Sequence, residues 1–306
     1  MIIYVKQFEK AKFIYKLFAI FKKEQIDGKT LIYIPINNKS RPRTVKKILE
    51  KLGKYFYINN IKNIVLEEKL MQNEEAKNIL YSYNINILDG TKLSKLMIYN
   101  TVQKIYQYKK SKIETGEITI LTNENNEINL QNINILAKNA KRINIITNNT
   151  RNFKKIVDYL YEELGILIKL SSNMKSNINS TDIIINMDFT EEALNKINIP
   201  NKAIIINIPK NINIKSKKFL GVNIKNWEIE IPSQYKMEGF DSKIVYEATL
   251  YQKPIIKAFE QIEKDKIKIK NFIGINGEIN KKETAAWKSC CFFAESTWLA
   301  RLTLIK

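Results

Sequence analysis

The stretch from Glu117 to Pro209 constrains the fold of this chain more than any other feature. It contains five apolar segments rich in isoleucine, which read ITIL, INIIT, ILIKL, DIIIN and AIIIN. Segments with helical spacing, Asn129 to Ala140 and Asn152 to Leu164, separate the first three. Because the apolar segments alternate too little to have a wet face, they predict a mostly parallel sheet covered by helices on both sides. We expect Gly165 to end the second helix in a left-handed turn.

The first hundred residues show a similar alternation and predict a second open α/β sheet, also mostly parallel. The expected strands are Ile2–Val5, Thr30–Ile36, Asn63–Glu67 and Ile85–Leu88. The expected helices are Phe8–Gln25, Thr44–Lys54, Gln72–Tyr81 and Thr91–Tyr108.

The basic run KKSK, followed by IETGE, indicates a passage between two domains. We therefore expect an N-terminal α/β domain over residues 1–110 and a Rossmann-like domain over 111–236. A returning helical segment follows over 237–283. Residues 284–306 form a tail in which asparagine disappears while tryptophan and both cysteines appear. A read-through or frame-shifted tail and a native C-terminal helix are both open.

Composition excludes several kinds of catalytic site. The chain has no histidine, which excludes Ser-His and Cys-His nucleophile pairs and His-ligated metals. Its two cysteines, Cys290 and Cys291, are adjacent, so neither a disulfide framework nor a zinc spacing is available. We expect no metal site.

The formal net charge of +20 would attract polyanions such as nucleic acid. The lysines are nevertheless scattered along the chain, and coding biased by an AT-rich genome explains part of the charge without a partner. The start, MIIYVKQFEK, lacks a basic segment followed by an apolar one, and no run reaches the ~20 apolar residues that span a bilayer. We expect a cytoplasmic protein without a membrane partner. The oligomeric state is open.

Several short blocks, in this order, resemble the shikimate and quinate dehydrogenase-like family. IPINNKSRP is similar to that family's substrate-carboxylate signature, NIVLEEK to its lysine block and ILDG to the block that opens its interdomain helix. NNTR resembles its adenosine-phosphate turn, and TDIIIN a strand of its second domain. VYEATLYQKPIIKAF is similar to the stretch before the helix that packs back onto the first domain. The blocks span most of residues 34–259.

The resemblance implies roles for six residues. Lys69 and Asp89 would form the proton-transfer pair, because a lysine beside a carboxylate can move a hydroxyl proton while hydride leaves carbon. Ser40 would contact the substrate. Asn148, Thr150 and Arg151 would meet the cofactor phosphate. The alternatives are an exposed lysine, an Asp-Gly turn that accepts backbone hydrogen bonds, a polar loop serine and an exposed arginine at a helix start.

The loop after the first strand of the Rossmann-like domain departs most from the family. It reads TNENNE, from Thr122 to Glu127, and contains none of the glycines that let backbone approach a pyrophosphate. Glu124 and Glu127 add negative charge beside the following helix N-terminus, which would otherwise suit an anion. NADP in the usual pose is therefore disfavoured.

Three functions follow as hypotheses. The leading one is a non-catalytic binding or regulatory relative of the shikimate dehydrogenase-like enzymes, with a small anionic ligand. The second is an NAD(P)-dependent oxidoreductase that acts on a hydroxy acid or ketone. The third is a basic nucleic-acid-binding protein, for which Tyr106 to Lys110 offers interleaved tyrosine and lysine but no known motif.

Overall fold

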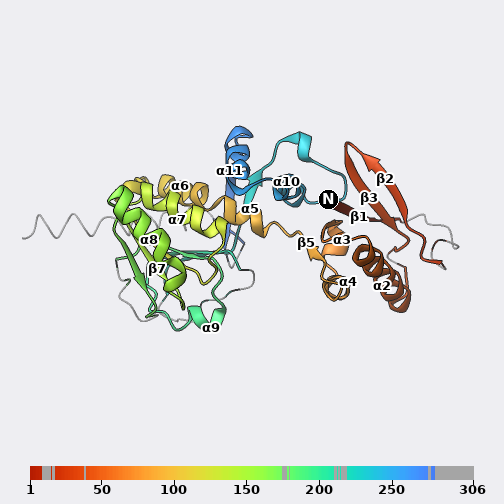
Figure 1. The fold of residues 1–306 in the computed structure, drawn as a ribbon, viewed down its shortest axis with the longest axis horizontal. Helices are drawn as coiled ribbons and strands as arrows, with labels where there is room; N and C mark the ends of the chain where they lie inside the picture. Colours follow the sequence, from red (N-terminus) through yellow and green to blue (C-terminus); the bar gives the residue numbers. More distant parts are fainter. Residues whose placement is uncertain are drawn as a thin grey trace, which may run out of the picture. The chain divides into compact units, whose positions relative to one another are not determined.

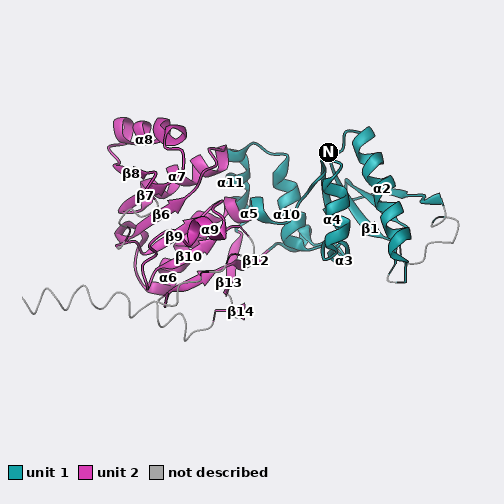
Figure 2. Cartoon of the chain, turned by 90° about the horizontal axis from the view of Figure 1, so that it is seen from below, with its two compact units in different colours: residues 1–93, 231–266 teal, residues 94–230, 267–306 magenta. Residues whose placement is uncertain are grey.

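The structure is a computed structural model of the 306-residue chain. It describes residues 1–8, 15, 18–37, 39–173, 178, 180–209, 212, 214, 219–274 and 277–279. The described part forms two compact units, residues 1–93 with 231–266 and residues 94–230 with the segment from 267 onward (Figure 2). The expected tail, with both cysteines, lies outside the described residues.

The first unit is built on a five-stranded sheet in the order β2–β3–β1–β4–β5. Its strands are β1 (Ile2–Gln7), β2 (Lys22–Ile26), β3 (Lys29–Ile34), β4 (Asn63–Leu66) and β5 (Asn86–Ile87). β1 pairs in parallel with β3 and β4, β4 pairs in parallel with β5, and β2 runs antiparallel to β3. The expected open, mostly parallel sheet is confirmed.

Helices cover both faces of the first sheet. They are α2 (Pro42–Ile58), α3 (Glu68–Met71), α4 (Glu74–Tyr81) and α10 (Ser242–Tyr251), and α11 (Ile255–Lys264) packs against α10. Successive β1 side chains point to opposite faces. Ile3 and Val5 join the core with α2 and α4, while Ile2 and Tyr4 join the core with α10. The C-terminal segment therefore returns to the first sheet, as expected, and its helix is interrupted at Pro254.

The predicted helix from Phe8 to Gln25 is wrong at its C-terminal end. Lys22–Gln25 belong to β2, which pairs with β3 through a tight turn at Asp27 and Gly28. Both turn residues have positive φ, 49° and 72°, as a two-residue hairpin turn requires. The Asp-Gly pair therefore closes a hairpin rather than ending a helix. Residues 9–14, 16 and 17 of the predicted helix lie outside the described residues.

The predicted long helix from Thr91 to Tyr108 is two helices, α5 (Thr91–Leu96) and α6 (Ile98–Lys109). The break falls at Met97, whose φ of −97° and ψ of 10° are not helical. Met97 is fully buried. The segment from Thr91 to Tyr108 contains no glycine or proline that would mark this break in the sequence.

The second unit is built on a six-stranded parallel sheet in the order β11–β10–β9–β6–β7–β8. Its strands are β6 (Glu117–Leu121), β7 (Arg142–Ile146), β8 (Ile168–Ser171), β9 (Ile183–Asn186), β10 (Ile204–Asn207) and β11 (Val222–Ile224). In chain order this is 3-2-1-4-5-6 from β8 to β11, the Rossmann arrangement. The expected Rossmann-like sheet is confirmed.

The helices of the second unit lie on both sides of this sheet. They are α6, α7 (Glu127–Asn139), α8 (Arg151–Leu164) and α9 (Glu191–Leu194). Figure 1 shows α6, α7 and α8 on one side and α9 on the other. Gly165 has a φ of 65° and ends α8, as predicted. A short antiparallel sheet of β12 (Asn226–Glu230), β13 (Lys268–Gly274) and β14 (Gly277–Glu278) completes the unit.

Candidate functional site

The carboxyl ends of β6 and β9 form the switch point of the second sheet, where the strand order reverses and where open α/β sheets bind their ligands. An internal carboxylate occupies this point. Asp188, two residues after β9, accepts hydrogen bonds from the backbone N–H of Asn123 at 2.8 Å and of Glu124 at 3.0 Å. The hydroxyl of Thr122 donates to the same carboxylate at 2.7 Å.

These donors belong to the loop that holds a cofactor phosphate in dinucleotide-binding Rossmann domains. A carboxylate and a phosphate can bind to the same backbone amides, since both are anions that accept several hydrogen bonds. The side chain of Asp188 therefore satisfies donors that would suit an anion. Its charge adds to that of Glu124 and Glu127 at this edge of the sheet.

The turn that carries Asp188 is fixed by a buried asparagine. The Oδ1 of Asn186 accepts from the backbone N–H of Phe189 at 2.8 Å, and its Nδ2 donates to the carbonyl of Phe189 at 3.1 Å. Asn186 also donates to Asn207 at 2.8 Å, and Asn207 donates to Asn223 at 2.6 Å. This asparagine ladder crosses β9, β10 and β11, and it holds the Asp188 turn against the sheet.

Further asparagines take the place of the missing glycines in the loop from Thr122 to Asn126. Asn126 caps α7 by accepting from the backbone N–H of Asn129 at 2.9 Å. The buried Nδ2 of Asn129 donates to the Thr122 hydroxyl and to the carbonyl of Glu124. Lys95 forms an ion pair with Glu124 at 2.9 Å. Side chains thus fill the inside of this loop.

The three residues with an expected cofactor role lie around the N-terminus of α8. The backbone N–H of Asn148 donates to Asn123 Oδ1 at 2.7 Å, which ties this turn to the Asp188 loop. Thr150 is the N-cap residue of α8 but makes no side-chain cap hydrogen bond. Arg151 is the first residue of α8 and is exposed. Their contacts with a phosphate stay a prediction.

Lys69 and Asp89 lie at the carboxyl edge of the first sheet. Lys69 is exposed on α3, three residues after β4, and Asp89 is half-buried two residues after β5. β4 and β5 are parallel neighbours, so both residues follow adjacent strand ends. Asp89 Oδ1 accepts from the backbone N–H of Thr91 at 3.0 Å, ahead of α5. The Asp-Gly turn that the sequence offers as the alternative is therefore present, with Gly90 at a φ of 86°.

Ser40 forms part of a polar turn after β3. Its hydroxyl donates to Asn37 Oδ1 at 3.0 Å, and its oxygen accepts from the backbone N–H of Asn37 at 3.0 Å. These bonds correspond to the polar loop serine that the sequence offers as an alternative. A substrate role for Ser40 stays a prediction.

Two buried carboxylates at the edge of the first sheet are absent from the sequence-based list of site residues. Glu67 accepts from the backbone N–H of Gln7 at 2.9 Å, and Glu247 of α10 accepts from the backbone N–H of Leu93 in α5 at 3.4 Å. Glu67 lies within the NIVLEEK block and Glu247 within VYEATLYQKPIIKAF. The local sequence does not show that α10 brings Glu247 to this edge, because that contact is long-range. Lys92 lies over the ring of Tyr251 at 4.2 Å.

A second polar group in the first unit joins α10 to the end of α11. The hydroxyls of Tyr235 and Tyr246 both donate to Asp265 Oδ2 at 2.9 Å. Burial, aided by Asp265, raises the pKa of the Tyr246 phenol. Burial alone would raise the pKa of Asp265, but hydrogen bonds from Gln261 and both tyrosines lower it overall. Tyr246, in the resembled block VYEATLYQKPIIKAF, therefore hydrogen-bonds within the first unit and links α10 to the end of α11.

The described residues hold no group of three or more acidic or sulfur-bearing side chains suited to a metal ion. No helix among them is both long enough and apolar enough to cross a bilayer.

Comparison with known proteins assigns no family. No protein-family model matches the chain, and no curated protein does. Among solved structures, L-tryptophan dehydrogenase from Nostoc punctiforme has 9% identity and a TM-score of 0.34 over 85% of this chain and 78% of its own. The A chain of dipicolinate synthase from Bacillus subtilis has 12% identity and a TM-score of 0.36, over 58% and 60%. An L-alanine dehydrogenase has 10% identity and a TM-score of 0.32, over 77% of this chain and 78% of its own. These overlaps are low, so the fold assignment rests on the strand order.

Proposed function

We propose that this chain is a non-catalytic binding or regulatory protein, a relative of shikimate dehydrogenase-like enzymes in which Asp188 replaces the cofactor phosphate. The observation that carries the proposal is the set of hydrogen bonds from Asn123, Glu124 and Thr122 to the Asp188 carboxylate. A diphosphate at this point would have to displace a bound anion of the protein and approach two further carboxylates, Glu124 and Glu127.

The proposal is tested by titrating the full chain with NADP and NADPH in isothermal titration calorimetry. We expect no saturable binding of either at millimolar concentration. NADPH binding at micromolar concentration would contradict the proposal. A positive control comes from Asp188→Ala, which frees the two amides, since this variant should gain affinity for inorganic phosphate.

A second function, that of an NAD(P)-dependent oxidoreductase, is favoured by one observation. Lys69 and Asp89 follow adjacent parallel strands, the placement that a proton-transfer pair needs. This function predicts nicotinamide oxidation or reduction with a hydroxy acid or ketone, and loss of that rate in Lys69→Ala and in Asp89→Ala. Absence of any turnover with NADP and a panel of such substrates would eliminate it.

A further inference from the structure

A cavity of the second unit opens at the amino ends of β7 and β8, the edge of the sheet opposite the Asp188 loop. Its volume is about 920 Å³, within the range of small-molecule sites. The cavity is lined by the end of α7, the residue that follows α8 and the first residues of the two strands. Four of its lining residues are cationic, namely Lys138, Lys141, Arg142 and Lys169, and none is acidic.

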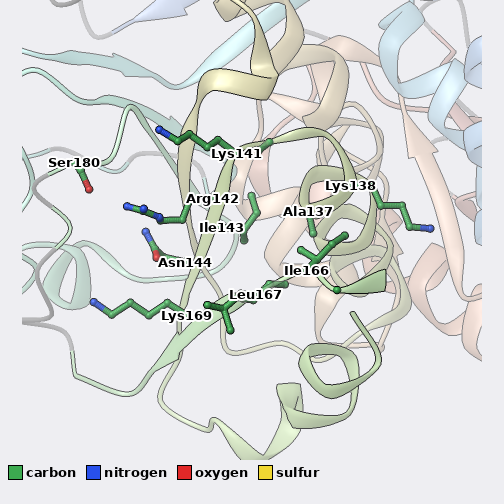
Figure 3. A pocket seen from close by; sticks show the side chains of 13 residues that line it. Ala137, Lys138, Lys141, Arg142, Ile143, Asn144, Ile166, Leu167, Lys169 and Ser180 are labelled. Atoms are coloured by element: carbon green, nitrogen blue, oxygen red, sulfur yellow. The ribbon is translucent and has the colours of Figure 1, made fainter. Parts of the chain in front are cut away.

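Strand geometry places three polar side chains of this cavity on one face of the sheet. Arg142 and Asn144 are two residues apart on β7, so they share a face. Lys169 pairs with Asn144 across the parallel strands and therefore lies on the same face. Figure 3 shows the charged ends of Lys141, Arg142 and Lys169 on the side of Ser180, with Asn144 between Arg142 and Lys169.

The positive charge here is only partly compensated. Arg142 forms an ion pair with Glu117 at 2.9 Å. Among the described residues, neither Lys141 nor Lys169 forms an ion pair. Lys138 lies in the last turn of α7, where it complements the helix dipole, and its side chain points away from the other three in Figure 3. Two lysine charges are left for a ligand.

The cavity also has an apolar side. Ile143 and Ile168 are buried and also line the cavity, from the face of the sheet opposite Asn144 and Lys169, and Ile166 lines it as well. Leu167 is 77% exposed, a large fraction for a leucine in a folded unit. An exposed leucine beside lysines without an ion-pair partner suits a ligand that carries both an apolar group and a negatively charged group.

We propose that this cavity binds a small organic phosphate. The phosphate would accept hydrogen bonds from Lys141 and Lys169, whose two charges match a dianion, and from the Asn144 amide at the base. The apolar group of the ligand would cover Leu167 and Ile166. This inference goes beyond the proposed function and is independent of Asp188, since it holds whether or not a dinucleotide binds at the carboxyl edge.

Phenyl phosphate is the probe, and calorimetry on the full chain is the measurement. We expect saturable binding that weakens about tenfold or more in Lys141→Ala/Lys169→Ala, as expected for lost hydrogen bonds to a charged group. The matched control is Lys154→Ala/Lys155→Ala, which removes two exposed lysines of α8 outside the cavity and should leave the affinity unchanged. Leu167→Glu should abolish binding without harming the fold, since Leu167 is exposed.

Several results would overturn the inference. These are no binding of phenyl phosphate at millimolar concentration, or equal losses in the two double-lysine variants. If inorganic phosphate binds as tightly as phenyl phosphate, the apolar group of the ligand contributes nothing to binding. If benzoate or phenol binds more tightly than phenyl phosphate, the site does not select a phosphate. NADP binding that Lys141→Ala/Lys169→Ala abolishes would belong to this cavity, whereas NADP binding that this variant retains would contradict the proposed function. The two proposals therefore fail separately.

Discussion

At the scale of single residues, the carboxylate of Asp188 satisfies three donors that a glycine-rich loop would offer to a cofactor. Replacing it with alanine leaves the backbone N–H groups of Asn123 and Glu124 without this acceptor. We expect Asp188→Ala to lower the free energy of unfolding by about 2 kcal/mol. Inorganic phosphate or sulfate should restore part of that loss, because the freed amides form an anion site.

Urea denaturation with and without phosphate measures both effects. Asp158→Ala is the control, since it removes a half-buried carboxylate on α8 that is outside the loop. We expect phosphate to stabilise Asp188→Ala more than the wild type or the control. Equal stabilisation of all three proteins would show that Asp188 does not occupy an anion site.

Tyr246 predicts a loss of stability at alkaline pH. Burial raises the pKa of this phenol, and burial also raises the pKa of Tyr4 to about 12. Because both phenol pKa values are raised above the ordinary value, the two neutral phenols contribute their full stability below about pH 10. This contribution to folding stability is lost as the pH rises further. Chemical denaturation across this window should show the wild type losing more stability than Tyr246→Phe. Parallel curves for the two proteins would contradict the assignment.

At the scale of elements, the asparagine ladder connects three parallel strands to the turn that carries Asp188. Asn207 is the central member and is 1% exposed. Asn207→Leu removes the acceptor of one Asn186 N–H bond and the donor to Asn223 Oδ1, both buried, so we expect a loss of about 3 kcal/mol of unfolding free energy. Thermal or urea denaturation measures it. A loss well below 1 kcal/mol would mean that the ladder contributes little.

The elements that the sequence predicts well are those whose burial is uniform. β6, β9 and β10 are almost wholly buried on both faces, and the alternation of apolar segments with helices leaves few arrangements other than a Rossmann-like sheet. β2 was missed because its residues, KKEQI, are mostly exposed and show no strand alternation. The flanking Asp27-Gly28 pair was the available signal for a hairpin.

The candidate site was less predictable because its contacts are long-range. The missing glycines between Thr122 and Glu127 are visible in sequence, and they single out the loop whose amides bind Asp188. The replacement anion is 65 residues from Asn123, and nothing near Asp188 marks it as a partner. The terminal asparagines of IIIN and IIIN repeat, yet only the pairing of β9 with β10 brings them into contact.

At the scale of the whole molecule, the net charge of +20 predicts weak attraction to any polyanion. The cations are scattered and no groove-reading element was recognised in the sequence, so we expect DNA binding that is independent of base sequence. Gel retardation should detect a complex at about 50 mM salt that is lost by about 200 mM. A complex that survives at the higher salt with one preferred sequence would contradict this expectation.

The most direct test of the central claim follows the backbone amides of Asn123 and Glu124 by NMR while NADP is added to the full-length wild type. If Asp188 holds these amides, their resonances stay unchanged up to millimolar NADP, whereas in Asp188→Ala they shift on addition of phosphate. A saturable shift of both amides with NADP in the wild type would contradict the claim and return the loop to cofactor binding.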